Sequence, residues 1–410
     1  MKSADALATV SPGKIALALG VLCSMGPFGT DMYLSALPQM ATEFHATDTD
    51  LQRSVMTFFA GLTLGQLFYG PISDRTGRKP VIYFSMLLFF AASIGCLFAR
   101  DVTAFNAWRF AQGLGGSVGM VLSNAVIRDL YTGREAHRLM SLVIMVIGVA
   151  PIVAPLIGGV LLTAGSWKAI FIALTILPAI CAGLVAALLP ETRMAELRRA
   201  SQPQRALHRY ARLIVDPKFI PYSGVLAFVQ GGFFAYIAGS PFVLIGVFGL
   251  SPLAYSLIFG LNAIGLGFGA QGGARAAMRF GPRVVVKIAT LVFALAALAL
   301  ALATFAGVSN LYIACGLLFV IVTAVGVIMP LCNVLGMEAF GAVSGSAAAL
   351  MGAMGFGAGA LASFGLGLVA GGGDRPMTAL IAALGAAACL TAYATFGRDR
   401  DATAVAPAHG

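Results

Sequence analysis

The chain has 410 residues, of which 59% are hydrophobic and only 10% are charged. Soluble domains carry about 25% charged residues, so this composition excludes a water-soluble fold and indicates an integral membrane protein. The formal net charge of +10 is no sign of nucleic-acid binding, because the basic residues lie in short loops between apolar runs, where they set membrane topology.

Twelve apolar runs follow one another along the chain. Each has about 20 residues or more, which is enough to cross a hydrocarbon core of about 30 Å. The runs are continuously apolar and do not alternate, which favours helices over the strands of a barrel. The sequence therefore predicts an all-α membrane protein with transmembrane helices near residues 15–36, 51–71, 80–99, 103–127, 139–163, 169–189, 219–246, 252–272, 284–306, 310–334, 346–370 and 377–397.

The longest polar stretch divides these runs into two sets of six. We expect an N-terminal six-helix bundle at 1–189, a cytoplasmic linker at 190–218 that could include a short amphipathic helix, and a C-terminal six-helix bundle at 219–410 with a short cytoplasmic tail. The loop Gly70–Lys79 corresponds weakly to Ala274–Arg283 in the second half. An offset of half the chain is what two six-helix pseudo-repeats predict.

Basic residues set the orientation. With the N-terminus inside, most of the 26 Lys and Arg residues fall on the inner side, and only Arg53, Arg100, Lys168 and Arg375 fall outside. This bias predicts a multi-pass protein of the cell inner (cytoplasmic) membrane with both termini in the cytoplasm.

Asp31 is the only acidic residue well inside any run, and Arg109 is a basic residue inside the fourth. Ionisable groups are costly within a membrane and are functional hypotheses by default. Counted along straight helices, both residues lie roughly 10–14 Å below the outer surface, so we expect them to approach each other, directly or through water. The alternative is that Asp31 is a hydrated residue of the outer interface.

The loop Gly70–Lys79 carries the most specific motif. Gly70 and Pro71 are expected to end a helix, and Gly77 permits a tight reversal of the chain. The stretch resembles the loop between spans 2 and 3 of the major facilitator superfamily, whose pattern G-x-x-x-D-R-x-G-R-R/K it matches at Gly70, Asp74, Arg75, Gly77, Arg78 and Lys79. Such a charged latch would hold the two halves together on the inner face in one state, and the alternative is a loop that only sets topology.

Two further motifs extend this resemblance. Arg109 lies in a stretch similar to the superfamily's R-x-x-Q-G pattern, which implies a role in proton coupling. The fifth run contains GVAPIVAPLIGG, similar to an antiporter signature ending in G-P-x-x-G-G, although Ala154 replaces the first glycine of that ending. The resemblance implies a kinked, closely packed helix that favours antiport, and ordinary glycine and proline packing is the alternative; the residues concerned are Gly148, Pro151, Pro155, Gly158 and Gly159.

The stretches DMYLSALP from Asp31, RDLY from Arg128 and PETR from Pro190 narrow the resemblance to the Bcr/CflA group of drug:proton antiporters. Ser35 stands where that group usually has proline. Candidate substrate contacts are aromatic, amide or thioether side chains, which suit a lipophilic and largely neutral molecule, although helix packing is an alternative for each. They are Tyr33, Asn124, Met145, Phe233, Phe234, Tyr236, Tyr255, Asn262 and Asn333.

These features together predict a proton-driven antiporter that exports small lipophilic drugs, similar to phenicols or bicyclomycin, by alternating access. The alternatives are a proton-coupled symporter for a small metabolite and a non-transporting receptor or scaffold. The sequence has no phosphate-binding G-x-x-x-x-G-K-[ST] loop, catalytic dyad or metal-ligand cluster, so we expect no enzyme activity, no metal and no cofactor beyond the proton gradient. The expected partners are the substrate, protons and membrane lipid, with no nucleic acid, and the expected state is a monomer.

Overall fold

The computed structural model describes residues 12–308, 310–368 and 373–396. Within this described part, twelve spans are long and apolar enough to cross a membrane, which confirms the predicted all-α membrane class. Each span overlaps one of the apolar runs. The helices are α2 (Pro12–Asp31), η1 (Leu34–Ala36), α3 (Leu37–Glu43), α4 (Asp48–Thr76), α5 (Arg78–Leu97), α6 (Val102–Gly116), α7 (Val118–Leu130), α8 (Gly133–Ala164), α9 (Lys168–Leu188), α10 (Ala195–Ala200), α11 (Gln204–Leu213), α12 (Ile220–Pro241), η2 (Phe242–Val247), α13 (Pro252–Phe280), α14 (Pro282–Phe305), α15 (Leu311–Glu338), η3 (Gly341–Val343), α16 (Ser344–Leu368) and α17 (Arg375–Thr395).

The first span is not one straight helix. It consists of α2, the short turn η1 and α3, and Asp31 is the last residue of α2. Pro27 lies inside α2 and Pro38 lies in the first turn of α3, so backbone N–H donors are missing on both sides of the break. The depth estimate for Asp31 assumed a continuous helix and was wrong in that respect, because the chain turns immediately after this residue.

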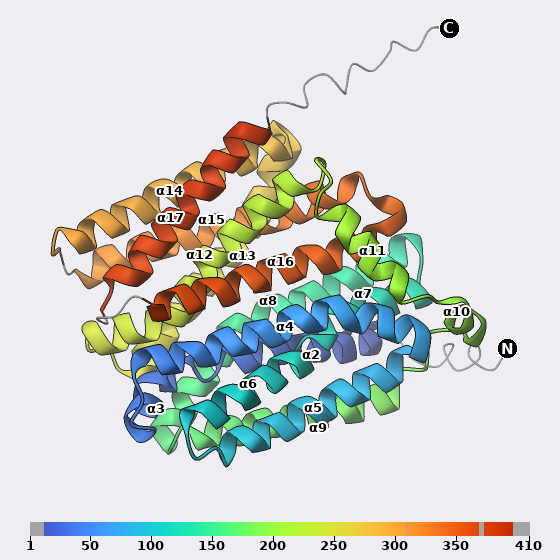
Figure 1. Cartoon of the computed structure of the whole chain (residues 1–410), viewed down its shortest axis with the longest axis horizontal. Coiled ribbons are helices and arrows are strands. Elements are labelled where there is room, and N and C mark those ends of the chain that lie inside the picture. Colours follow the sequence, from blue (N-terminus) through green and yellow to red (C-terminus); the bar gives the residue numbers. More distant parts are fainter. Residues whose placement is uncertain (1–11, 309, 369–372, 397–410) are drawn as a thin grey trace, which may run out of the picture.

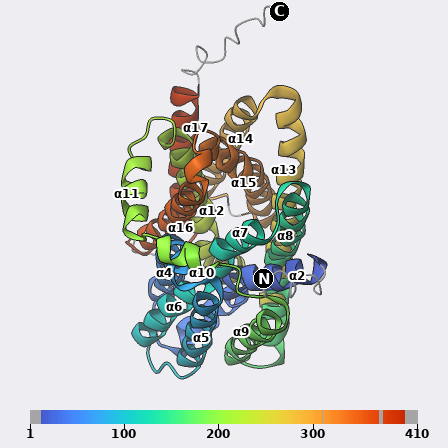
Figure 2. The same cartoon turned by 90° about the vertical axis from the view of Figure 1, so that its right-hand side faces the viewer.

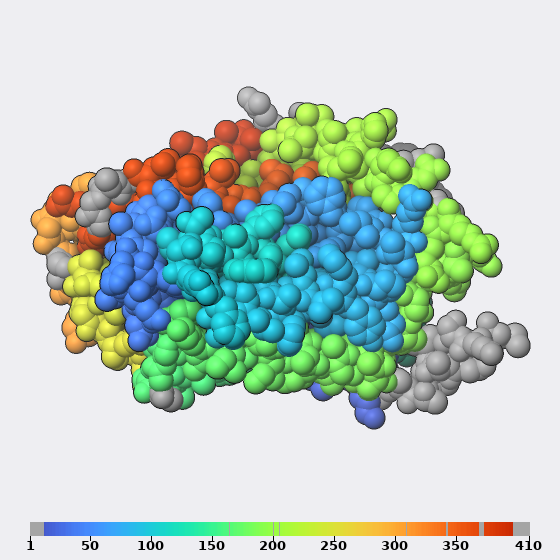
Figure 3. All heavy atoms as spheres, turned by 60° about the horizontal axis from the view of Figure 1, so that its bottom comes forward, coloured from blue at the N-terminus to red at the C-terminus, as the bar shows by residue number. Residues whose placement is uncertain are grey.

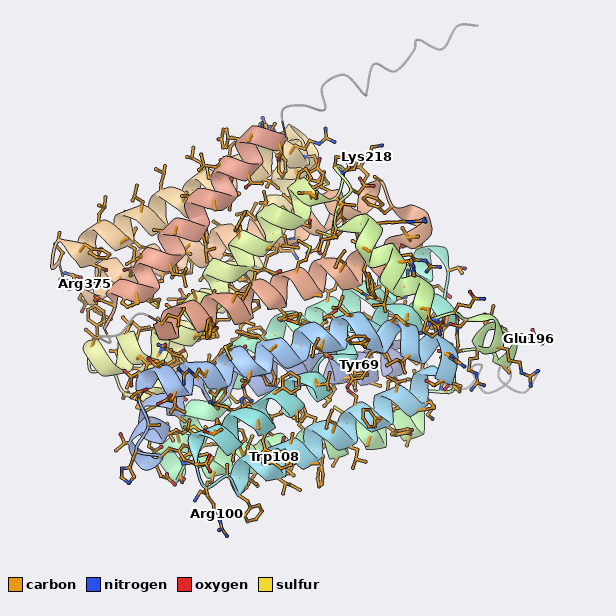
Figure 4. The ribbon with its side chains drawn as sticks, in the orientation of Figure 1. Tyr69, Arg100, Trp108, Glu196, Lys218 and Arg375 are labelled. Atoms are coloured by element: carbon orange, nitrogen blue, oxygen red, sulfur yellow. The ribbon has the colours of Figure 1, made fainter. Side chains whose placement is uncertain are left out.

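The two halves of the chain lie side by side and contact each other along two pairs of helices. Figure 1 shows the first half, from blue to green, below the second half, from yellow to red. One contact joins α4 to α16, and the other joins α8 to α13. We call the end of the bundle that carries α10 and α11 the linker end, and the opposite end the far end. Glu196 and Lys218 lie toward the linker end, whereas Arg100 and Arg375 lie at the far end (Figure 4).

At the far end, glycines allow close packing around the break in the first span and between the halves. A Cβ atom at Gly158 of α8 would lie only 1.8 Å from the carbonyl oxygen of Met32, so this position requires glycine. Its neighbour Gly159 lies against Ser256 of α13, where a Cβ would be 2.7 Å from the hydroxyl oxygen. At the other contact, Gly367 of α16 lies against Thr49 of α4.

The linker end is bridged by the amphipathic helix α11. Its residues Ala206, Tyr210 and Leu213 are buried, whereas Leu207 and Arg209 are exposed. The helix contacts α16, and the Tyr210 hydroxyl donates a hydrogen bond to the carbonyl oxygen of Leu67 in α4 at 3.1 Å. Figure 2 looks onto this end, and Figure 3 shows the yellow-green linker covering the ends of the blue helices of the first half.

Proline chemistry explains the Tyr210 contact. Pro71 lies inside α4, which continues to Thr76, so the prediction that Gly70 and Pro71 end a helix was wrong. Because proline has no N–H, the carbonyl oxygen four residues earlier, on Leu67, loses its helical donor. The Tyr210 hydroxyl supplies the missing donor, which is how proline is tolerated within membrane helices. Burial raises the pKa of Tyr210 to about 12, so the hydroxyl keeps this proton even at pH values where an exposed tyrosine would lose it.

Candidate functional site

A cavity lies between the halves, with a volume of about 180 Å³. It is lined from the first half by α2, α4, α7 and α8, and from the second half by α12, α13, α15 and α16. Most of its lining is aromatic or aliphatic. The lining residues are Gly26, Pro27, Thr30, Asp31, Phe59, Leu62, Met120, Pro151, Gln230, Phe233, Phe234, Tyr236, Ile237, Phe259, Asn262, Ala263, Leu266, Val322, Met329 and Phe356.

Asp31 is the carboxyl group that lines this cavity. The residue is only 5% exposed. Among the described residues, no side chain or backbone N–H donates a hydrogen bond to its carboxyl group, and no cation lies within ion-pair distance of it. An unpaired carboxylate in apolar surroundings carries a large free-energy penalty that the neutral acid avoids. The cavity therefore strongly disfavours a bare negative charge at Asp31.

The remaining polar groups of the cavity come mainly from the second half. The Asn262 amide nitrogen donates a hydrogen bond to the Tyr236 hydroxyl oxygen at 2.8 Å, which fixes both side chains. The carbonyl oxygen of the Gln230 amide is buried and has no hydrogen-bond partner among the residues that the structure describes. On the first-half side, the Thr30 hydroxyl donates to the Gly26 carbonyl oxygen of its own helix at 3.0 Å. The cavity thus offers a molecule few hydrogen-bonding groups among many aromatic surfaces.

Arg109 is fully buried but does not meet Asp31. Its guanidinium carbon lies 4.0 Å from the ring centroid of Tyr33 and 4.2 Å from that of Phe58, and one nitrogen donates to the Gln112 amide oxygen. Two other guanidinium nitrogens, Nε and Nη2, have no hydrogen-bond partner within the described ranges. Contact with two aromatic faces offsets part of the burial cost of the charge.

The predicted direct contact between Asp31 and Arg109 is absent from the described residues in this conformation. The break in the first span explains this, because the chain turns after Asp31 and places the ring of Tyr33 over the guanidinium. The Tyr33 hydroxyl in turn shares a hydrogen bond with Ser54 at 3.0 Å. An approach through water stays a prediction.

The structure divides the predicted substrate contacts into two groups. Phe233, Phe234, Tyr236 and Asn262 all line the cavity. The others do not line it. Tyr33 covers Arg109, Tyr255 is buried with its hydroxyl bonded to Ser240 at 3.1 Å, Asn124 and Met145 are exposed, and the Asn333 amide donates to the Met329 carbonyl oxygen of its own helix.

The residues of the fifth-span motif also fall into groups with different surroundings. Pro151 lines the cavity, Pro155 is buried, and Gly158 and Gly159 make the close contacts of the far end. Gly148 was expected to allow a close neighbour, but it is exposed and a Cβ there would meet no atom within 4 Å. The tight packing is therefore confined to the last part of the motif, where α8 meets the break in the first span.

The loop between α4 and α5 forms an ion-pair network around Arg78. This side chain is 5% exposed, and its Nη1 and Nε atoms lie 2.9 Å from Asp74 and 2.9 Å from Asp129, respectively. Arg193 adds a second, longer ion pair to Asp74 at 3.6 Å. Gly77 has φ of +105°, a conformation that favours glycine, and it makes the reversal between the two helices, as expected.

Glu191 completes the network, and the motif analysis gave it no role. Its carboxylate accepts hydrogen bonds from the backbone N–H groups of Arg78 at 2.9 Å and Lys79 at 3.1 Å, at the start of α5. Because Gly77 has no side chain to cap this helix, Glu191 supplies both acceptors and a favourable charge near the helix dipole. The only sequence signal was its place in the PETR stretch.

These contacts correct the expected latch. Among the described residues, the ion pairs of Asp74 reach Arg78 and Arg193, which belong to the first half and to the start of the linker. None reaches the second half in this conformation. The other charged residues of the motif are peripheral to the network, since Arg75 is exposed and the Lys79 ammonium lies over the Tyr83 ring at 5.8 Å from its centroid.

Residues 17–363 match the Major Facilitator Superfamily. The chain belongs to this superfamily. It is 32% identical to the multidrug resistance protein D of Escherichia coli (strain K12), over 85% of this chain and 87% of that protein. It is 34% identical to the MFS-type transporter YdgK of Bacillus subtilis (strain 168), over 82% of this chain and 84% of that protein.

A third relative concerns the predicted resemblance to the Bcr/CflA group. The bicyclomycin resistance protein homolog of Haemophilus influenzae is 30% identical over 67% of this chain and 69% of that protein. Together with the multidrug resistance relative, this similarity confirms the predicted resemblance to the bicyclomycin-resistance group.

Solved structures support the fold. A D-xylose–proton symporter superposes with a TM-score of 0.76 at 18% identity, over 93% of this chain and 97% of that chain. At this identity the likeness concerns the major facilitator fold alone. The activity of the superfamily is transport and not catalysis, in agreement with the expectation from the sequence.

Sequence reasoning missed several cavity residues of this major facilitator protein. Phe59, Phe259 and Phe356 line it, but a phenylalanine in an apolar run gives no sign of which side faces a cavity. Gln230 had a signal, because an amide inside a membrane helix is unusual and needs a partner or a cavity.

Proposed function

We propose that this protein is a proton-driven antiporter that exports small lipophilic molecules from the cytoplasm by alternating access. The observation that carries the proposal is Asp31, a carboxyl group that lines an apolar cavity between the halves and has no partner in the described part of the chain. A membrane carboxyl in such a place is suited to bind and release a proton as its surroundings change.

The cavity supports coupling between proton and substrate at one site. While the cavity is sealed from water, a charge at Asp31 is unfavourable, so the carboxyl group holds a proton. When the cavity opens to water, the carboxylate becomes hydrated and can release that proton. A lipophilic molecule that enters next to Asp31 displaces water, so its binding and the protonation state influence each other by linkage.

The substrate class follows from the lining. Aromatic faces, the Tyr236–Asn262 pair and the unpaired Gln230 oxygen suit a largely neutral, lipophilic molecule with one or two hydrogen-bonding groups. The names of two relatives, a bicyclomycin resistance protein homolog and a multidrug resistance protein, agree with a drug-like cargo.

The proposed direction of transport depends on which end of the helix bundle faces the cytoplasm. By the positive-inside rule, the linker end and both termini would face the cytoplasm, and we infer that the protein lies in the inner membrane. The far end, where Gly158 and Gly159 pack closely, would then face outward in this conformation. A cytoplasmic molecule would enter from the linker end, and a proton would enter from the outside after the halves rearrange.

The test expresses the protein in a drug-sensitive host that lacks its main exporters. Growth is measured against a panel of lipophilic compounds. Extrusion is measured as accumulation of a compound inside everted vesicles with an imposed pH gradient, because the cytoplasmic face of these vesicles is outside. We expect the wild type and Asp48→Asn, an exposed carboxylate at the start of α4, to confer resistance. We expect Asp31→Asn to lose pH-driven extrusion even though it is present in the membrane at the same level.

If Asp31→Asn extruded substrate with the pH dependence of the wild type, the coupling role would be refuted. Uptake that rises with external acidity, without any change in drug susceptibility, would support the alternative of a proton-coupled symporter for a small metabolite.

A further inference from the structure

A second cavity lies at the linker end, beside the ion-pair network, whose residues Asp74, Arg78 and Arg193 form part of its wall. Its volume is about 340 Å³. Its walls come from α4 and α7 of the first half, from the linker around α11, and from the first turns of α16 in the second half. The first half, the linker and the second half therefore meet at this cavity.

Four guanidinium groups line this cavity, from Arg78, Arg128, Arg193 and Arg209, and a single carboxylate, Asp74, lines it with them. Asp74 is already paired with Arg78 and Arg193. Within the described ranges, neither Arg128 nor Arg209 makes an ion pair or a hydrogen bond with its side chain. Arg78 pairs with Asp129 as well. The excess of positive charge therefore comes from Arg128 and Arg209, which have no counter-ion among the described residues.

The position of Arg128 adds an independent argument. Its Nη2 atom would lie 3.3 Å from a Cβ atom at Gly345, in the first turn of α16. The N-terminus of a helix carries a partial positive charge, so a cation placed there without an intervening anion is repelled. An anion between Arg128 and this turn would convert the repulsion into attraction on both sides.

We propose that this cavity binds a phosphate-type anion, either the headgroup of an acidic phospholipid or a free phosphorylated molecule. Arginine forks match phosphate oxygens in geometry, and the hydroxyl of Ser346 lines the same wall. The volume has room for a phosphate with a small substituent. The inference goes beyond the proposed export function and does not depend on the identity of the exported molecule.

A bound anion would touch α7, α11 and α16 together, and so would link the first half, the linker and the second half. Binding must then be tighter in the conformation that brings these elements together than in the one that separates them. The anion would act as a removable clamp of the linker end, a role that the ion pairs of Asp74 do not fill in this conformation.

The test uses the purified full-length protein in detergent. Binding of short-chain phosphatidylglycerol, short-chain phosphatidylcholine and inorganic pyrophosphate is measured by native mass spectrometry and by the shift in melting temperature. The test variant is Arg128→Gln/Arg209→Gln. The matched control is Arg199→Gln/Arg212→Gln, which removes the same charge from exposed linker residues that do not line the cavity.

We expect the wild type and the control to bind phosphatidylglycerol saturably, and the test variant to bind it roughly ten-fold or more weakly, because each lost charge-assisted hydrogen bond is worth about one order of magnitude. Equal binding of pyrophosphate would indicate a free phosphorylated molecule as a ligand, whereas preference for phosphatidylglycerol over both other probes would indicate a lipid headgroup.

Equal affinities of test variant and control, or no anion binding by the wild type, would overturn the proposal. Without ligand, the variants should match in melting temperature and elution volume. If the double variant differs from the control in melting temperature or elution volume, the single variant Arg209→Gln, on the exposed face of α11, replaces it. Its affinity for phosphatidylglycerol is then compared with that of the control.

Discussion

Gly158 gives the sharpest test of how the far end closes. A Cβ atom at this position would lie 1.8 Å from the Met32 carbonyl oxygen and 2.8 Å from the Met32 carbonyl carbon. Unbonded carbon and oxygen atoms keep about 3.3 Å apart, so Gly158→Ala requires a displacement of about 1.5 Å. The obstacle is backbone, which cannot rotate away as a flexible side chain can.

The expected cost follows from this displacement. Overpacking of a tight contact costs about 1–3 kcal/mol. Gly148 is the matched control on the same helix, because a Cβ there meets no atom within 4 Å, and alanine in place of a helical glycine gains up to about 1 kcal/mol. Both glycines lie inside α8, so this gain is common to the two variants and cancels in the comparison. We therefore expect Gly158→Ala to be about 1–3 kcal/mol less stable than Gly148→Ala.

Two measurements check this reasoning. Thermal denaturation of the purified variants in detergent should give Gly158→Ala a melting temperature several degrees below that of Gly148→Ala. Hydrogen exchange should become faster at residues 32–36 in Gly158→Ala, because the segment at the break of the first span loses its close packing on α8. Equal melting temperatures and equal exchange in the two variants would refute the account of far-end closure.

Two further predictions concern the linker end. Arg78→Ala removes the buried cation between two carboxylates and should cost about 3 kcal/mol, whereas Arg75→Ala, an exposed neighbour, should change the melting temperature little; equal effects would contradict the network. Tyr210→Phe leaves the Leu67 carbonyl oxygen without its donor and should cost about 1 kcal/mol, measured by protection of α11 from proteolysis. The pKa of Tyr210 is raised to about 12 in the folded state from about 10 in the unfolded state. Its contribution to the free energy of unfolding is therefore complete below pH 10 and declines as the pH rises through 12. The Tyr210→Phe variant should lack this decline.

Several features were predictable because they depend on short stretches of chain. The twelve spans follow from the length of each apolar run, since about 20 apolar residues cross the membrane in any context. Asp31 was identified as exceptional because a carboxyl group stands out in an apolar run without any knowledge of its neighbours. The reversal at Gly77 followed from the residue type alone, because glycine adopts a positive φ without strain.

Other features depended on contacts between distant residues. Gly148 and Gly158 are both glycines of the fifth apolar run, and the sequence does not distinguish them. In the structure, only Gly158 faces the Met32 carbonyl group. Tyr33 and Tyr236 are both aromatic residues of membrane spans, and only Tyr236 lines the cavity, because the turn after Asp31 directs Tyr33 onto Arg109. Glu191 acts on residues more than a hundred positions earlier in the chain, which no local pattern indicates.

The sequence by itself determined that this is a twelve-span membrane protein of the major facilitator superfamily with a single carboxyl group deep in its spans, because hydrophobic length and isolated charge are local properties. Only the tertiary structure decided the surroundings of that carboxyl group. It breaks the first span after Asp31, turns the carboxyl group into the cavity between the halves and leaves Arg109 between two aromatic rings. These outcomes depend on which helices pack together, and packing is settled by the whole set of contacts and not by any one stretch of residues.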